Sequence, residues 1–245
     1  MEYIACELCG SDDSGLLFTA KDLNQRMEGS FRVVRCRLCG LIYLNPRPGK
    51  EEMASWYPVD YYTGAPGAYT ADKFEPGKKE TTRRRLLKYI KTGKILDIGC
   101  NNGEFLAGLK ELGWDARGVE ISPLAAQHAR EKHGLDVTVA DFADTHFGNE
   151  QFDVVTLWHT LEHLRHPLEA LREINRIIKT GGLLALSLPN IDSFQARIFK
   201  DKWFHLDVPR HLFHFSPATP GIFFSGVQRR FFGFINAGDG GSCLR

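Results

Sequence analysis

The sequence lacks long apolar runs, a surplus of charge and a secretion signal. No uninterrupted apolar stretch is long enough to span a bilayer, and the opening residues MEYIACELCG lack the basic and apolar regions of a signal peptide. Lysine and arginine number 31 against 30 aspartates and glutamates, giving a net charge of +1. This balance provides no strongly basic field for a long polyanion and so does not support nucleic acid as a partner. We expect a cytoplasmic protein without a membrane span.

Cysteine is sparse, with 6 in 245 residues, yet four of them form a regular pattern. The segments CELCG, from residue 6, and CRLCG, from residue 36, are matched knuckles separated by a polar stretch and an expected strand over residues 31–35. Each knuckle can place two thiolates on one side of a tetrahedral ion. The pattern predicts a zinc ribbon, and disulfides or a redox pair are the alternative that a reducing compartment disfavours. The expected ligands of structural Zn²⁺ are Cys6, Cys9, Cys36 and Cys39.

Residues 94–103, KILDIGCNNG, combine an apolar run with a glycine turn. A buried strand entering a turn and a helix N-terminus is typical of a nucleotide-type site. A dinucleotide fold would carry three glycines, but this turn has only Gly99 and Gly103. Asp97 and Glu104 place two carboxylates where a pyrophosphate would lie, which favours a ligand that carries positive charge.

Strand and helix patterns alternate from the glycine turn onward. This alternation predicts an α/β fold, a Rossmann-like doubly wound, mostly parallel sheet with its ligand at the carboxyl ends of the strands. The expected strands are residues 95–98, 116–121, 135–140, 152–158 and 182–188. The expected helices are residues 80–91, one that opens at Glu104, one from Pro123 to Gly134, and residues 167–178, the last being stopped by Gly181 and Gly182.

The segment LDIGC-x-x-G resembles the first motif of class I S-adenosylmethionine-dependent methyltransferases, of the type 11/23 and UbiG-like kinds. The resemblance extends over about residues 81–216 and implies S-adenosylmethionine as cofactor. Glu120, at the end of the second strand, suits the ribose hydroxyls, and Asp141 suits the adenine amine. The alternative for either acid is a solvated loop carboxylate. The expected cofactor-binding residues are Asp97, Gly99, Cys100, Asn101, Gly103, Glu120, Ile121, Asp141, Phe142 and Trp158.

The stretch TLWHTLEHLRHP, residues 156–167, would face the transferable methyl group in this family. If it is a helical turn, His159, Glu162 and His163 share one face. We expect His163 first, and then His159, as a base or a substrate-positioning group. A purely structural histidine and a divalent metal site stay open. A hard cation is disfavoured because His159 stands where related families carry an acid.

Residues 203–217, WFHLDVPRHLFHFSP, resemble a segment of sugar C-methyltransferases that also carry an N-terminal cysteine cluster. That resemblance implies a catalytic contribution from His211. Neighbouring family residues are replaced here by Val208 and Arg210, so the enolising mechanism of those enzymes does not carry over.

We expect four regions, namely a zinc ribbon over 1–45, a linker with a short helix over 46–79, the methyltransferase domain over 80–216 and an atypical tail over 217–245. The tail breaks a helix at Pro220-Gly221 and has no strand period, which we interpret as truncation or a shifted reading frame. The predicted function is methyl transfer to a small molecule such as a sugar or cell-surface glycan precursor. An RNA methyltransferase and a non-catalytic cofactor or zinc-ribbon binding protein are the alternatives. The acceptor atom and the oligomeric state have no signal in the sequence.

Overall fold

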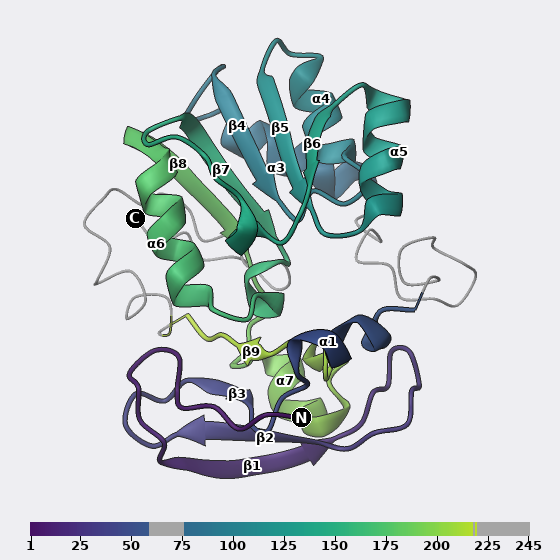
Figure 1. Cartoon of the computed structure of the whole chain (residues 1–245), viewed down its shortest axis with the longest axis vertical. Helices are drawn as coiled ribbons and strands as arrows, with labels where there is room; N and C mark the ends of the chain where they lie inside the picture. The colour runs from purple at the N-terminus through teal and green to yellow at the C-terminus, as the bar shows by residue number, and fades with distance from the viewer. Residues whose placement is uncertain (59–75, 218, 220–245) are drawn as a thin grey trace.

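A computed structural model describes residues 1–58, 76–217 and 219 and arranges them around two sheets, one above the other in Figure 1. The larger sheet has five parallel strands in the order β6-β5-β4-β7-β8. The smaller sheet is antiparallel, in the order β1-β2-β3-β9. The predicted Rossmann-like doubly wound sheet is therefore confirmed.

The strands of the larger sheet follow the apolar runs of the sequence. They are β4 (Lys94–Ile98), β5 (Asp115–Glu120), β6 (Asp136–Val139), β7 (Phe152–Trp158) and β8 (Ile178–Ser187). The helices between and around them are α3 (Pro76–Leu86), α4 (Glu104–Lys110), α5 (Pro123–His133) and α6 (Pro167–Ile177). α5 begins at Ser122, whose Oγ accepts a hydrogen bond from the amide of Ala125, and ends at Gly134 with φ of 60°. Both ends were readable because a serine cap and a left-handed glycine are local signals.

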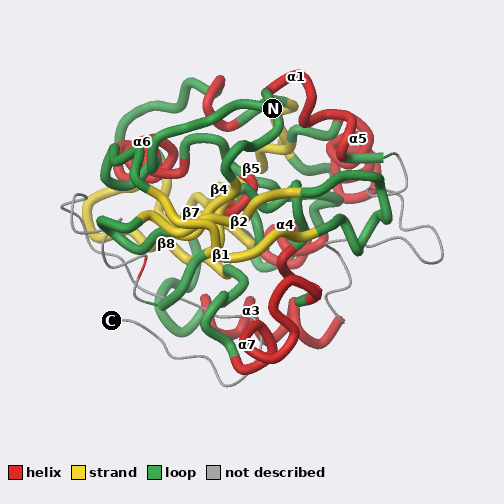
Figure 2. The backbone as a smooth tube through the Cα atoms, turned by 90° about the horizontal axis from the view of Figure 1, so that it is seen from below, coloured by secondary structure: helices red, strands yellow, loops and turns green. Residues whose placement is uncertain are grey.

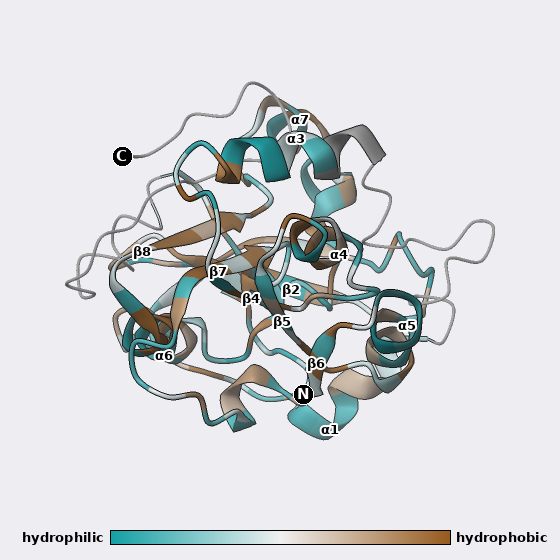
Figure 3. Ribbon diagram, turned by 90° about the horizontal axis from the view of Figure 1, so that it is seen from above, coloured by the Kyte–Doolittle hydropathy of each residue, from teal (hydrophilic) through white to brown (hydrophobic). Residues whose placement is uncertain are grey.

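Helices cover both faces of the larger sheet. α3, α4 and α5 share one apolar core with Ile95 and Val154, whereas α6 packs with Leu96 and Val155 on the other face. Neighbouring residues point to opposite faces because the side chains of a strand alternate. Figure 2, seen from below, shows helices placed around the strands, and Figure 3 shows hydrophobic colour along strands such as β8 and hydrophilic colour along α3.

Two predicted helix ends are wrong. The helix expected over 80–91 spans Pro76–Leu86 and gives way to a turn at residues 87–89, because the chain must reverse before β4. The helix before Gly181 and Gly182 already ends at Ile177, and both glycines lie within β8. A side chain at Gly182 would come within 2.9 Å of the carbonyl oxygen of Asp153. That glycine therefore serves an irregular strand pairing and not a helix stop.

The smaller sheet carries the cysteine knuckles and includes a strand from the far end of the sequence. Its strands are β1 (Ser14–Ala20), β2 (Phe31–Cys36), β3 (Ile42–Leu44) and β9 (Phe213–His214). The sequence pattern did not reveal β1, because residues 10–30 are polar overall. β9 pairs with β3 through Ile42 and Tyr43, so the segment expected within the methyltransferase domain also completes the N-terminal sheet.

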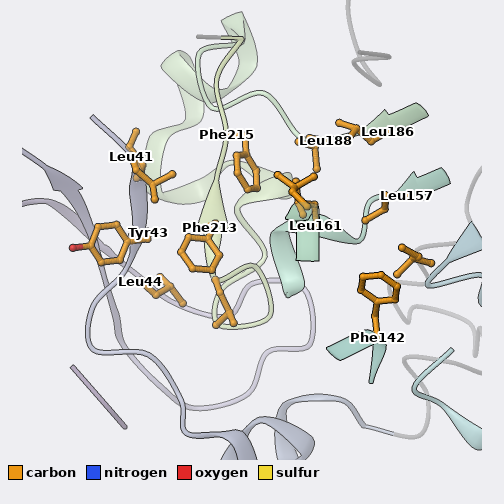
Figure 4. Packing of buried hydrophobic residues seen from close by; sticks show 14 of the residues in the cluster. Leu41, Tyr43, Leu44, Phe142, Leu157, Leu161, Leu186, Leu188, Phe213 and Phe215 are labelled. Carbon is orange, nitrogen blue, oxygen red and sulfur yellow. The ribbon is translucent and has the colours of Figure 1, made fainter. Parts of the chain in front are cut away.

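One hydrophobic core joins the two sheets. Tyr43 and Phe213, from the smaller sheet, belong to the same cluster as Leu157 and Leu186 of the larger sheet. Figure 4 shows Phe215 and Leu161 between these two groups. Since no polar layer separates the sheets along this path, the N-terminal sheet folds against the α/β unit as part of one body.

Short elements complete the described chain. They are α1 (Lys50–Met53), η1 (Ala54–Trp56), η2 (Phe142–Asp144), η3 (Leu161–His163), α7 (Phe194–Phe199), η4 (Lys200–Lys202) and η5 (Phe204–Leu206). Residues 59–75 of the expected linker, residue 218 and the tail from residue 220 lie outside the described residues. Within the described part, none of the helices has the length and apolar character needed to cross a membrane.

Candidate active site

A cavity of about 530 Å³ lies at the carboxyl ends of the parallel strands, where α1 and η1 of the N-terminal part cover them. This is the expected ligand position in an open parallel sheet. Its lining includes every predicted cofactor residue except Gly103, namely Asp97, Gly99, Cys100, Asn101, Glu120, Ile121, Asp141, Phe142 and Trp158. Among the three predicted catalytic histidines, His159 and His163 line it.

The turn after β4 brings the backbone close to the cavity. Gly99 has φ of 74°, and a side chain there would come within 2.5 Å of Thr160 Oγ1. Only glycine meets both conditions without strain. Asp97 is buried and its Oδ1 accepts a 2.6 Å hydrogen bond from Thr156 Oγ1. β7 therefore orients the carboxylate that β4 delivers to the site.

The two glycines of the turn serve different purposes. Gly103 does not line the cavity, and an added side chain would meet Ala129 at 2.8 Å and Leu135 at 2.5 Å. It lets α4 begin against α5. Glu104, one of the two acids that suggested a cationic ligand, is likewise absent from the lining.

Glu120 is held by the backbone on both sides. Its Oε2 accepts from the amide of Asn101 at 2.9 Å, and its Oε1 accepts from the amide of Ser122 at 2.8 Å. The carboxylate is 6% exposed and lines the cavity. Two backbone amides therefore orient the carboxylate at the wall of the cavity.

An apolar slot adjoins Glu120. Phe142 is buried on one wall, while Ile121 lines the same cavity with 62% of its surface exposed. Asp141 stands beside Phe142, and its Oδ1 accepts from the amide of Ala143 at 3.1 Å. Two apolar side chains and a carboxylate form a suitable recess for a flat, amine-bearing ring.

Cys100 and Trp158 also line the cavity. Burial raises the pKa of the Cys100 thiol, which points to a packing role. A side chain at Gly118 would lie 2.4 Å from this sulfur, so the thiol faces β5. Trp158 packs its ring edge-on against Phe105, with centroids 5.2 Å apart.

His163 is the histidine best placed for proton transfer. Its Nδ1 lies 3.1 Å from the carbonyl oxygen of Arg210 and 3.0 Å from Tyr57 Oη. We assign the proton to Nδ1 and the lone pair to Nε2, because a carbonyl only accepts. In this tautomer the Tyr57 hydroxyl acts as an acceptor toward Nδ1. Burial lowers the pKa of His163, so the imidazole is neutral near pH 7 and able to act as a base.

The condition for a shared helical face is not met, because His159 lies outside the turn that contains Glu162 and His163. The 3-10 turn spans Leu161–His163, whereas His159 precedes it with φ of 53°. Its Nδ1 still lies 3.5 Å from Glu162 Oε1, and its Nε2 lies 3.4 Å from Ser187 Oγ. The histidine thus reaches the cavity by a backbone bend that residue spacing did not reveal.

His211 lies behind His163 and not in the cavity lining. It is 3% exposed, its Nδ1 donates to the carbonyl of His205 at 2.9 Å, and its ring centroid is 4.5 Å from that of His163. Burial lowers the pKa of His211 well below its ordinary value. The catalytic contribution of His211 that the family resemblance of residues 203–217 implies stays a prediction.

The group that could hold a cation also differs from the expected one. Glu162, His163 and His211 each offer a ligand atom, and these atoms lie within 4.8 Å of one another. Glu162 is 1% exposed, and within the described structure neither of its carboxylate oxygens has a hydrogen-bond partner. The donor set of two imidazoles and one carboxylate suits a borderline transition-metal ion better than magnesium.

The four cysteines of the knuckles gather at one end of the smaller sheet. Cys6 and Cys39 sulfurs are 3.5 Å apart, as are those of Cys9 and Cys36, and all four lie within 4.8 Å of one another. A tetrahedral Zn²⁺ with Zn–S bonds of about 2.3 Å needs sulfur separations of about 3.8 Å. Burial raises the pKa of Cys39 to about 11, so a bound cation is what would keep this thiol deprotonated.

Several lining residues had no distinguishing sequence signal. Lys50, Met53 and Arg165 line the cavity together with Tyr57. Charged and aromatic residues at loop positions are common, so only the approach of α1 to the parallel sheet identifies them.

Curated proteins with similar sequences include methyltransferases. A ubiquinone biosynthesis O-methyltransferase from Glaesserella parasuis is 32% identical over 107 residues, which cover 40% of this chain and 45% of that protein. The chain spans about half the length of the curated relatives it matches.

Solved structures show the same fold. A SAM-dependent methyltransferase from Archaeoglobus fulgidus superposes with a TM-score of 0.52 at 26% identity, over 62% of this chain and 69% of that one. One from Thermotoga maritima gives a TM-score of 0.52 at 24% identity, over 63% and 72%. The model of the methyltransferase domain family matches residues 72–219, more than half of the 245 residues. The chain belongs to this family.

Proposed function

We propose that the protein transfers a methyl group from S-adenosylmethionine to a hydroxyl of a small polar acceptor. One observation carries this proposal, namely that Asp97, Glu120 and Asp141 line the same cavity as His163. A cofactor held by the three carboxylates would therefore meet an acceptor held beside the histidine, without crossing a protein wall.

Each carboxylate has a distinct partner in this proposal. Glu120, oriented by two backbone amides, accepts hydrogen bonds from the ribose hydroxyls. Asp141 accepts from the adenine amine, with Phe142 and Ile121 against the ring faces. Asp97, fixed by Thr156, lies on the side that would receive the positively charged amino group. S-adenosylmethionine supplies an electrophilic methyl group on a sulfonium when bound.

His163 provides the base. Its Nε2 lone pair accepts the proton of the acceptor hydroxyl, while the oxygen forms its bond to the methyl carbon and the carbon–sulfur bond breaks. The positive charge that the bound sulfonium would bring would then reside on the protonated His163, so charge balances. Alignment and exclusion of water supply most of the rate in such a displacement, and a general base adds about 10²–10⁴-fold.

The acceptor end favours a small, polar molecule. Tyr57 and His159 line the cavity together with His163, and two of the curated relatives are named ubiquinone biosynthesis O-methyltransferases. These features support an oxygen acceptor, and we propose a sugar or glycan precursor as its class. We also infer that the four-cysteine cluster holds structural zinc.

Binding of the product S-adenosylhomocysteine tests the proposal, because this ligand cannot turn over. Titration calorimetry on the zinc-loaded protein should give a Kd on the order of micromolar. Asp97→Ala and Glu120→Ala should each weaken binding at least about tenfold, since one charged hydrogen bond contributes about 1.5–3 kcal/mol.

Asp136→Ala provides the matched control, because this exposed acid lies at the first residue of β6, away from the carboxyl ends of the strands. It should bind as the wild type does. If folded, zinc-loaded wild-type protein does not bind S-adenosylhomocysteine, the proposed methyltransferase activity is rejected. The hypothesis of a non-catalytic zinc-ribbon binding protein would then replace it.

A further inference from the structure

Arg210 forms a buried ionic cluster between the N-terminal sheet and the candidate active site. The side chain is fully buried, and its Nη1 and Nη2 donate to the two carboxylate oxygens of Asp22 at 3.0 and 2.6 Å. Nε and Nη2 also donate to Asp207 Oδ1 at 3.0 and 2.6 Å. A final bond, at 3.1 Å, runs from Nη1 to the carbonyl of Trp56. These contacts use the five N–H donors of a guanidinium.

Asp22 is the member of this cluster that comes from the cysteine-bearing sheet. It lies in the connection between β1 and β2, 188 residues from Arg210 in sequence. The amides of Asn24 and Gln25 donate to its Oδ1 at 3.2 and 3.0 Å. The backbone of that connection thereby fixes the carboxylate before it meets the guanidinium.

Arg210 in turn determines what His163 contacts. Its own carbonyl accepts the hydrogen bond from His163 Nδ1. Its guanidinium holds the carbonyl of Trp56, the residue next to Tyr57, whose Oη lies 3.0 Å from the same Nδ1. Both partners of His163 Nδ1 are therefore anchored through one buried side chain.

We propose that Asp22 is a positioning residue for His163, acting through Arg210, so that the zinc-ribbon region sets the tautomer and orientation of the active-site histidine. The inference rests on the proposed function for its catalytic consequence. The geometric part needs only the Asp22–Arg210–His163 contacts. A planar, bidentate carboxylate–guanidinium pair suits this purpose because it fixes direction as well as distance.

The direct test is the tautomer of His163 in long-range ¹H–¹⁵N spectra of the zinc-loaded full chain labelled with ¹⁵N-histidine. His163→Gln assigns the signal among the 9 histidines. The wild type should show Nδ1 protonated and Nε2 unprotonated. Asp22→Asn should broaden or split this pattern because Arg210 loses its bidentate partner.

Asp13→Asn is the matched control. Asp13 lies in the same N-terminal region, but its 3.4 Å pair with Arg37 is exposed, so its loss should leave the His163 signal unchanged. If Asp22→Asn does not fold, Asp22→Glu keeps the charge, lengthens the side chain by one methylene and should still shift the signal. An unchanged His163 pattern in a folded Asp22 variant would overturn the proposal.

Activity provides the second readout. Asp22→Asn should lower kcat about 10–100-fold, as expected for a misplacement of about 1 Å. The Kd for S-adenosylhomocysteine should stay within about twofold, since Asp22 is not among the residues that line the cavity. A loss of affinity equal to the loss of kcat would contradict positioning and indicate general destabilisation. Wild-type protein that does not bind this ligand, yet shows the Asp22-dependent His163 signal, would reject the proposed function and retain the positioning contact.

Discussion

At the residue scale, the candidate chemistry depends on which nitrogen of His163 carries the proton. The Arg210 carbonyl selects Nδ1, which leaves Nε2 as the only ring nitrogen able to accept a proton. Burial lowers the pKa of the imidazole, so a neutral base is available at physiological pH. Nothing in the sequence spacing around His163 sets it apart from other histidines, so burial is what suits it to act as a neutral base.

We predict that His163→Gln lowers kcat about 10²–10⁴-fold, the usual contribution of a general base. The affinity for S-adenosylhomocysteine should be unchanged, because His163 lies on the acceptor side. In the wild type, kcat/KM should rise with pH while His163 loses its proton and level off above its pKa. Since burial lowers that pKa, the midpoint should lie below about 6.5. A pH–rate profile measures it.

The variant should also lose this acidic limb. A profile for His163→Gln that keeps the same midpoint would assign the titrating group to another residue, and a structural role for His163 would then be the better interpretation.

At the element scale, the turn between β4 and α4 separates ligand contact from packing. Gly99 lines the cavity and meets Thr160, whereas Gly103 packs against α5 and Leu135. Both have positive φ, of 74° and 78°. The two glycines belong to one sequence motif, but a side chain at Gly99 would collide with Thr160, whereas one at Gly103 would collide with Ala129 and Leu135.

We predict that Gly103→Ala destabilises the fold by about 1–3 kcal/mol through overpacking and backbone strain, while the folded fraction binds S-adenosylhomocysteine normally. Gly99→Ala should show a comparable loss of stability together with at least about tenfold weaker binding. Urea unfolding and calorimetry measure the two effects. Gly113→Ala is the control, because Gly113 has φ of 85° but no atom close to where a side chain would lie. This variant should lose stability through backbone strain alone, and its affinity for S-adenosylhomocysteine should not change. If Gly103→Ala weakens binding and Gly99→Ala does not, Gly103 would be assigned to the cofactor site instead of Gly99.

At the scale of the whole molecule, the two sheets share one core. β9 reaches from residues 213–214 to pair with β3, and Phe213 and Tyr43 belong to the same cluster as Leu157 and Leu186. The Asp22–Arg210 pair adds a polar connection across this junction. The cysteine cluster therefore belongs to the same folded body as the candidate site.

We predict one zinc per chain and a single cooperative unfolding transition. Removing the zinc with a chelator, or by Cys36→Ser, should lower the midpoint of that transition as seen by both far-UV circular dichroism and tryptophan fluorescence, because loss of a ligand of the folded state destabilises it by mass action. Metal analysis and thermal melts measure this. Two separate transitions, with only the first responding to zinc, would show that the sheets fold independently.

A second metal equivalent lost in Glu162→Gln would assign the Glu162, His163 and His211 group as a cation site.

The site was partly predictable because some of its residues follow strands directly. Asp97, Glu120 and Asp141 could be identified from residue order, since the carboxyl ends of parallel strands meet at one edge. Gly103 and Glu104 follow the same motif but face away from the cavity, because the start of α4 turns them toward other contacts. Residue order sets which strand carries a side chain, and helix direction sets where that side chain points.

Local patterns by themselves determined the parallel sheet, the cysteine knuckles and the cofactor side of the cavity, because apolar periodicity, glycine turns and C-x-x-C spacing act over a few residues. Tertiary structure alone decided that β9 completes the N-terminal sheet, that His211 joins Glu162 and His163 in the candidate cation group, and that Asp22 reaches Arg210. These contacts join residues far apart in sequence, and they form only when the shared core brings the two sheets together.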